Sequence, residues 1–192
     1  MKKFFSLMLF AMGLVFTANA WAGGHSSDVM APDRVSKWDW GVGISGGIND
    51  EANDAVFLST AFSYGVTPYI GLGVEAGWQE ADSDNTAEDT IGVVPIMADI
   101  ILRIPTVHDK LVPYGVLGLG GAGVYISRDN QDDVDDTAFA WKLGGGADWF
   151  ISDNRILNFE FAYWNAGAEL PGTSVDDDYN WWTLGVGLKY VF

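Results

Sequence analysis

Seven segments of this chain alternate between large apolar residues and small or polar residues with a period of two. This pattern is typical of β-strands whose two faces meet different surroundings. The segments are 38–48, 56–64, 70–79, 95–104, 139–151, 157–164 and 182–192. An eighth segment, 113–126, carries so many glycines that its phase is not fixed, and a bulge near Gly120 and Gly121 would reconcile its two halves. The chain is therefore expected to be all-β, with eight strands of about 9 to 13 residues.

The connections between these segments alternate in length. Short connections fall at 66–68 and 152–155, a medium one at 105–112, and long ones at 49–54, 80–90, 127–137 and 165–179. Short turns at one end and long loops at the other are typical of an antiparallel up-and-down meander. The length of 192 residues allows one ordinary domain. We predict an eight-stranded antiparallel up-and-down β-barrel.

The charges decide which face of the strands points inward. One face holds the large apolar residues and no charge. The other face consists mostly of glycine, alanine and serine, with a few larger residues such as Phe57, Met97, Ile101 and Trp164. This second face also holds all the charged residues of the predicted strands: Asp39, Glu75, Asp99, Arg103, Lys142, Asp148, Glu160 and Lys189. An eight-stranded barrel has room inside only for side chains. The bulky face must then point outward, which favours a transmembrane barrel over a water-soluble carrier barrel.

Aromatic residues gather near both ends of the predicted strands. Trp38, Trp40 and Trp149 lie at the short-turn end, and Trp78, Trp141 and Trp182 at the long-loop end. Two such rings are typical of the girdles at the two membrane interfaces. The alternative, an ordinary aromatic core in a β-sandwich, does not explain why the charges share the glycine-rich face.

The first twenty residues predict export. Lys2 and Lys3 precede an apolar stretch, and small residues follow at Ala18, Ala20 and Ala22. This is the pattern of a bacterial secretory signal peptide, residues 1–20, with cleavage after residue 20 or 22. Residues 23–37 are then expected to form an unstructured periplasmic tail, and residues 38–192 the barrel. An N-terminal anchor helix is the alternative.

Composition excludes several classes of function. A net charge of −16 argues against a nucleic-acid partner, and the absence of cysteine excludes disulfides, thiolate metal sites and a cysteine nucleophile. No cofactor is expected. Of the 26 acidic residues, 17 lie in the four long connections, where they could bind Ca²⁺ or Mg²⁺ or form only a solvated acidic surface. The densest candidate for a weak cation site is Asp129, Asp132, Asp133, Asp135 and Asp136, which does not fit an EF-hand.

The eight inward charges must pair, because an isolated buried charge costs several kcal/mol. We predict an ion-pair network that fills the lumen. The same network could also act as a switchable gate for a narrow ion path.

The chain resembles the small OmpA/OmpX-type outer-membrane β-barrels of Gram-negative bacteria. The resemblance rests on the signal peptide, on the segment 113–120, and on a last strand with apolar residues at every second position and an aromatic end. It implies that Leu188, Tyr190 and Phe192 form a signal read by the barrel-assembly machinery. It also implies long loops at the cell exterior. The chain stops at Phe192, so the periplasmic peptidoglycan-binding domain of OmpA is not expected.

The resemblance says more about architecture than about function. We expect a monomeric integral outer-membrane protein with a structural and surface-interaction role, whose acidic loops meet lipopolysaccharide, divalent cations or host surfaces. A narrow ion or small-solute channel is the alternative. An enzyme is not expected: the enzymes of this architecture use a histidine near the outer rim, and His25 and His108 are predicted to lie in the tail and in an inner-side turn.

Overall fold

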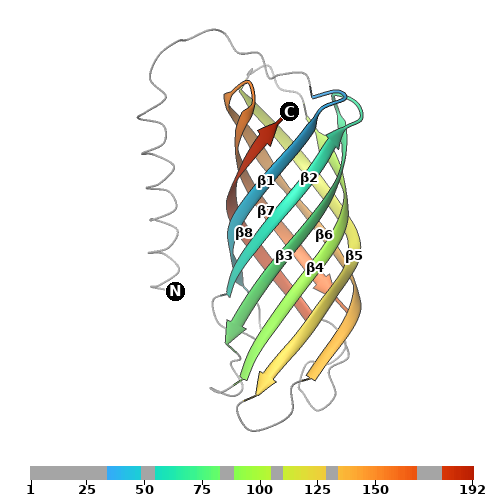
Figure 1. The fold of residues 1–192 in the computed structure, drawn as a ribbon, viewed down its shortest axis with the longest axis vertical. Coiled ribbons are helices and arrows are strands. Elements are labelled where there is room, and N and C mark those ends of the chain that lie inside the picture. The colour runs from blue at the N-terminus through green and yellow to red at the C-terminus, as the bar shows by residue number, and fades with distance from the viewer. Residues whose placement is uncertain (1–33, 49–54, 83–88, 105–109, 129–133, 168–178) are drawn as a thin grey trace.

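A computed structural model describes residues 34–48, 55–82, 89–104, 110–128, 134–167 and 179–192. They form a closed barrel of eight strands in which each strand pairs with its neighbours in the chain (Figure 1). The strands are β1 (Trp38–Ile48), β2 (Ala55–Gly65), β3 (Ile70–Asp82), β4 (Asp89–Arg103), β5 (Leu111–Arg128), β6 (Val134–Ser152), β7 (Arg155–Ala166) and β8 (Tyr179–Val191). The predicted all-β, eight-stranded antiparallel barrel is confirmed. None of the described residues belongs to a helix long and apolar enough to cross a membrane.

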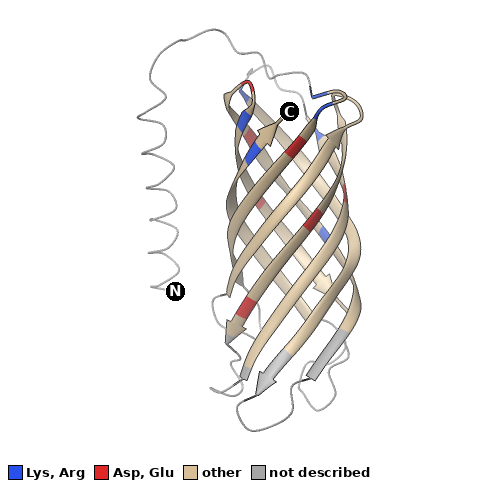
Figure 2. Cartoon of the chain, in the orientation of Figure 1, with Lys and Arg blue, Asp and Glu red and all other residues tan. Residues whose placement is uncertain are grey.

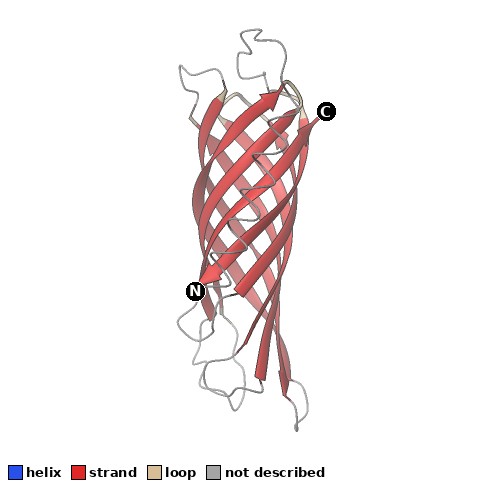
Figure 3. Cartoon of the chain, turned by 90° about the vertical axis from the view of Figure 1, so that its left-hand side faces the viewer, coloured by secondary structure: helices blue, strands red, loops and turns tan. Residues whose placement is uncertain are grey.

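Pairing of the first strand with the last closes the barrel. In β1, Trp40 faces Phe62 of β2 on one side and Tyr190 of β8 on the other. Both pairings are antiparallel and continuous along β1, so neither edge of the sheet is left open. The strands are tilted relative to the long axis and cross it in the same sense, as the view in Figure 3 shows. Closure satisfies the backbone hydrogen bonds of the strands within the barrel.

Three strands exceed the predicted length of about 9 to 13 residues. β4, β5 and β6 have 15, 18 and 19 residues and extend toward the long-loop end. Parts of the predicted loops 80–90 and 127–137 are therefore strand. Asp135 and Asp136, for example, pair with Tyr125 and Val124. Strong strand formers on β5 thus hold acidic residues of β6 in the ladder, although acidic residues alone disfavour strands.

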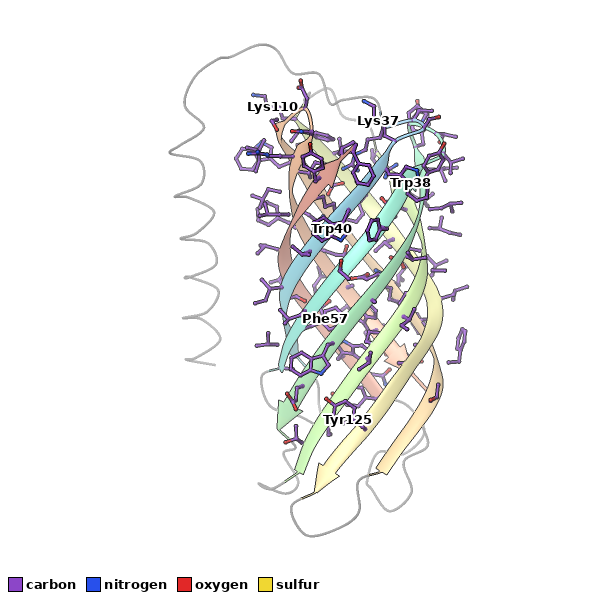
Figure 4. All side chains as sticks on the ribbon, viewed as in Figure 1. Lys37, Trp38, Trp40, Phe57, Lys110 and Tyr125 are labelled. Carbon is purple, nitrogen blue, oxygen red and sulfur yellow. The ribbon has the colours of Figure 1, made fainter. Side chains whose placement is uncertain are left out.

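The predicted faces are those observed. Large apolar side chains of all eight strands are exposed on the outside, where Figure 4 shows them projecting from the ribbon. Phe57, Met97 and Trp164 are buried inside, as expected, and Ile101 is half-buried on the same inner face. The exposed residues of the outer face include Leu72, Val74, Ile96, Leu119, Phe139, Leu143, Phe161, Leu184 and Leu188. An apolar surface of this kind suits hydrocarbon rather than water.

The predicted bulge in β5 is wrong. β5 pairs with β4 and with β6 without a shift in register, and its inner face runs through Val112, Val116 and Val124 in one phase. The phase was obscured because glycines stand on both faces of the strand. Gly120 faces inward, and a Cβ there would overlap the carbonyl oxygen of Ile96. Between the described strands, the register shifts only at Phe150 and Ser152, where β6 turns into β7.

An arginine on the outer face tests the assignment of that face. Leu143 lies on the outside of β6, opposite Leu117 and Tyr163. Leu143→Arg should lower the free energy of unfolding from phospholipid vesicles by about 2 to 4 kcal/mol, because the charge enters hydrocarbon. Leu143→Ala, the control for lost side-chain contacts, should cost less. Equal losses in a urea titration would contradict an outward, lipid-facing Leu143.

Two glycines of β5 provide a matched test of packing inside and outside the wall. Gly120→Ala should destabilise the barrel by about 1 to 3 kcal/mol, since the new methyl group overlaps the backbone of β4. Gly123→Ala should change stability by less than about 0.5 kcal/mol, because nothing lies within 4 Å of the added Cβ. Unfolding of both variants in the same vesicles measures the two losses in free energy. A larger loss for Gly123→Ala than for Gly120→Ala would contradict a β5 strand whose inner face continues in one phase.

Candidate functional site in the charged lumen

Four of the predicted inward charges meet halfway along the barrel. Lys142 of β6 forms ion pairs with Glu75 of β3 and Asp99 of β4, the latter at 3.0 Å, and lies 3.9 Å from Glu160 of β7. The ammonium group also lies 5.0 Å from the ring centre of Trp164. Lys142 is only 1% exposed. Glu75, Asp99, Lys142 and Glu160 are called the central cluster below.

A glycine on the strand between them lets Asp99 and Lys142 meet. In the register of the sheet, Gly118 of β5 stands between these two residues. A Cβ on Gly118 would lie 2.5 Å from Oδ1 of Asp99 and 2.8 Å from Cγ of Lys142. The missing side chain therefore leaves the inner surface of β5 open for an ion pair that spans the strand.

A second group of charges lies at the short-turn end. Asp148 of β6 accepts hydrogen bonds from Arg34 at 2.8 Å, from Lys189 of β8 at 3.1 Å and from Asn158 of β7 at 2.9 Å. Asp148 is 1% exposed, so its charge needs these donors. Arg34, Asp148, Asn158 and Lys189 are called the mouth cluster. Figure 2 shows most of the basic residues of the described strands and turns gathered toward this end.

Tyr114 connects the two clusters. Its hydroxyl donates a hydrogen bond to Glu160 at 2.7 Å and accepts one from Asn158 at 2.7 Å. The ammonium of Lys189 lies 4.9 Å from the centre of the Tyr114 ring. One inward aromatic residue of β5 thus bridges an acidic group and a basic group, so the polar contacts form a continuous chain along the lumen.

The remaining predicted pair is looser. Arg103 of β4 lies 3.8 Å from Asp39 of β1, and both side chains are buried. The guanidinium group covers Gly71, where a Cβ would come within 2.8 Å of it. Its nitrogen atoms make no hydrogen bond to the described residues. The structure therefore places all eight predicted lumen charges on the inner face. Their ion pairs form three groups, of which the central and mouth clusters are joined by the hydrogen bonds of Tyr114 and Asn158.

Arg34 was missed by the sequence analysis, which treated residues 23–37 as an unstructured tail. Residues 34–37 instead form a turn against β2: Ser36 donates its backbone N–H to Gly65, and Gly65 donates to Lys37. A Cβ on Gly65 would overlap the carbonyl oxygen of Arg34, so this glycine makes room for the turn. Arg34 is 6% exposed and also lies over the ring of Phe150. Residues 1–33, including the predicted signal peptide, lie outside the described residues.

Beyond the central cluster, aromatic residues fill the lumen toward the long-loop end. Phe57 packs edge-on against Trp164 at 5.2 Å, Trp164 stacks on Trp181 at 5.5 Å, and Trp181 lies 5.4 Å from Tyr179. These four residues, called the inner aromatic layer, belong to a larger buried apolar group. Trp181 and Tyr179 were missed because the last strand was predicted to begin at residue 182. It begins at Tyr179, so both face inward.

A cavity of about 80 Å³ adjoins the central cluster. Its lining combines small residues such as Gly43, Ser59 and Gly185 with the charged residues, Tyr114 and apolar side chains such as Trp164. A cavity of this size with polar groups in its lining can hold several water molecules. The lumen thus contains a small chamber of mixed polar and apolar lining between the mouth cluster and the inner aromatic layer.

The six predicted girdle tryptophans all lie on the outer face. Trp38, Trp40, Trp78, Trp149 and Trp182 are exposed and Trp141 is half-exposed. Most pack against an outer aromatic neighbour: Trp38 lies 4.9 Å from Tyr64, and Trp141 and Trp182 both contact Tyr163. Trp78 donates a hydrogen bond to Tyr125 at 3.2 Å, across β4. A Cβ on Gly92 of β4 would overlap the Tyr125 ring, so Gly92 permits that crossing.

Two other predictions concern the chain's C-terminal end and its acidic loops. Leu188, Tyr190 and Phe192 project outward and are exposed, and their role as an assembly signal stays a prediction. Asp129, Asp132 and Asp133 lie outside the described residues, and the side chains of Asp135 and Asp136 are not described either. Within the described part of the chain, no three His, Cys, Asp or Glu residues are arranged to hold a metal ion.

Comparisons with known proteins agree on one family. The family described as outer membrane protein beta-barrel domain matches residues 8–192. The 31 kDa outer-membrane immunogenic protein of Brucella melitensis is 30% identical over 98 residues, which cover 45% of this chain and 41% of that protein. The same name and figures hold for the protein of Brucella suis. The chain therefore spans less than half the length of these relatives.

Solved structures share the fold at low identity. Neisserial surface protein A matches with a TM-score of 0.62 and 11% identity over 81% of this chain and 96% of its own. Ail of Yersinia pestis has a TM-score of 0.54 and 15% identity over 82% and 99% of the two chains. The N-terminal barrel of Pseudomonas aeruginosa OprF has a TM-score of 0.54 and 16% identity over 82% and 98%. At these identities the likeness concerns the fold alone.

The central cluster predicts unequal roles for the two inner lysines. Lys142→Met should lower the free energy of unfolding by about 3 to 5 kcal/mol, because three carboxylates then lose their shared cation. Adding Glu75→Gln to this variant should recover part of the loss, since one uncompensated charge is removed. Lys189→Met should lower the free energy of unfolding by a smaller amount, because Asp148 retains its ion pair with Arg34. Urea unfolding in vesicles measures all three, and equal losses for Lys142→Met and Lys189→Met would contradict the assignment.

Proposed function

Because the chain belongs to the outer membrane protein beta-barrel family, we propose that it is a structural and surface-interaction protein with a closed lumen. It is an integral outer-membrane barrel, and the name of the Brucella relative also places that protein in the outer membrane. In this proposal the barrel serves as a rigid anchor in the membrane, and it presents its loops to the cell exterior. It carries no substrate through its interior and performs no chemical reaction there.

The filling of the lumen is the observation that supports this proposal. From the short-turn end, the mouth cluster comes first, then the central cluster, and then the inner aromatic layer. Lys142, Trp164 and Trp181 are each at most 1% exposed. A hydrated ion needs a continuous wet path, whereas an eight-stranded barrel has an interior that side chains fill. Two ionic layers and one apolar layer would have to open together before anything passed.

The surface role rests on the predicted loops. Twelve of the 17 acidic residues assigned to the four long connections lie outside the described residues. A carboxylate-rich surface can bind divalent cations and so bridge to the phosphates of lipopolysaccharide, or it can meet a host surface. The name of the Brucella relative calls that protein immunogenic. This is compatible with surface exposure of a barrel related to the present one.

A narrow ion channel is the second candidate, and the cavity beside the central cluster favours it. Its volume of about 80 Å³ and its charged wall provide a place where a small ion could stay. Passage to the long-loop end would still require the inner aromatic layer to move. Channel function therefore needs a conformational change, whereas the structural role needs none.

Conductance in planar bilayers distinguishes the two candidates. The wild-type barrel should be silent in concentrated KCl, because Trp164 and Trp181 close the lumen. The double variant Trp164→Ala and Trp181→Ala should show small openings, which proves that inserted barrels are detectable. Discrete openings of the wild type that change in Lys142→Ala would favour the channel instead. Heat-modified migration on detergent gels, before and after boiling, verifies that each variant is folded.

A further inference from the structure

Basic residues are concentrated at the short-turn end of the barrel. The described part of the chain contains eight Lys and Arg residues, and six belong to this end: Arg34, Lys37, Arg103, Lys110, Arg155 and Lys189. Lys142 lies in the central cluster, and Arg128 ends β5 at the opposite end. The chain as a whole is strongly acidic, with a net charge of −16, so this gathering runs against its composition.

Three of these residues are accessible from outside. Lys37, Lys110 and Arg155 are exposed, and they are called the basic rim. Lys37 precedes β1, Lys110 precedes β5 and Arg155 begins β7. The rim therefore extends over the half of the barrel from β5 through β7 to β1 and is not directed at one point. Among the described residues of this end, Asp153 is the one exposed acidic residue. Inside the mouth, Arg34, Arg103 and Lys189 outnumber Asp39 and Asp148 by one charge.

The basic rim lies at the depth of the aromatic girdle. Arg155 is paired directly with Tyr190, and Lys37 precedes Trp38, which is hydrogen-bonded through its backbone to Phe192. Lys110 precedes Leu111, which pairs with Trp149. Exposed Trp and Tyr side chains at a barrel end lie at the level of the lipid headgroups. Long basic side chains beside them reach the phosphates of that layer.

We propose that the basic rim binds anionic phospholipid headgroups in the leaflet that surrounds the short-turn end. The ligand chemistry is a lipid phosphate with net negative charge, such as that of phosphatidylglycerol. Three exposed cations at the ends of three different strands cannot converge on one small anion, but each can contact a headgroup of its own. The barrel then selects its lipids at one end through the rim, and its predicted acidic loops lie at the other.

Quenching of tryptophan fluorescence by brominated lipids tests this in a bilayer. The full barrel is refolded into vesicles that mix phosphatidylcholine with either brominated phosphatidylglycerol or brominated phosphatidylcholine, and the relative binding constant is measured. We expect the wild type to prefer the anionic lipid by about fivefold or more at low salt. The preference should fall toward one at high salt, since exposed charges are screened.

Exposed-site variants identify the residues responsible. The triple variant Lys37→Gln, Lys110→Gln and Arg155→Gln should lose the preference while it retains heat-modified migration. Asp153→Asn, which removes an acidic residue from the same end, should raise the preference for the anionic lipid. Arg128→Gln removes one positive charge at the opposite end and should leave the preference for the anionic lipid unchanged. Equal quenching by both lipids in the wild type, or an undiminished preference in the triple variant, would overturn the proposal.

A further experiment determines whether the basic rim binds lipid phosphate or free phosphate. The same titration is run in inorganic phosphate and in chloride at equal ionic strength. An unchanged preference for phosphatidylglycerol supports headgroup binding. A preference abolished by phosphate but not by chloride would show that the rim takes a free anion, and would overturn the lipid assignment.

Discussion

Closure of the sheet by the pairing of β1 with β8 is the constraint on which the rest of this structure depends. Hydrocarbon offers no partner for a free N–H or C=O group, so a strand edge such as that of β1 cannot stand in the membrane. Once the sheet closes, its inner face surrounds a narrow lumen, and its outer face meets lipid. Alternation along each strand then sends Trp40 outward and Asp39 inward. The inward position of the eight lumen charges follows from this division.

The narrow lumen makes glycine as important as the charged residues. Asp99 and Lys142 meet because Gly118 leaves the intervening strand bare, and Arg34 enters the mouth because Gly65 has no side chain. Both positions are places where a methyl group would collide with the ion pair or the turn. The glycine content that first suggests a weak strand is thus the means by which charged side chains fit inside eight strands. The charged side chains can therefore pack inside the barrel only because glycines lie beside them.

The sequence predicted the faces well and the partners poorly, for a physical reason. Alternation is local, so the inward direction of Glu75 or Lys189 can be determined from neighbouring residues alone. Pairing depends on the register between strands, and Lys142 could not be joined to Glu75 without knowing how four strands align. Arg34 was missed because its placement depends on a turn against Gly65, far along the chain. Trp181 was missed because a ladder continued beyond the apparent strand end.

The distribution of inner charges explains why the lumen holds together without matched pairs. The central cluster has three carboxylates for one lysine, whereas the mouth has more cations than carboxylates. Neither group is neutral alone, but Tyr114 and Asn158 connect them through hydrogen bonds. The acidic excess of one group and the basic excess of the other therefore attract along the axis in a poorly screened interior. Tyr114 links these opposite charges and so joins the middle of the barrel to its mouth, whereas the buried apolar group that includes the inner aromatic layer carries no charge.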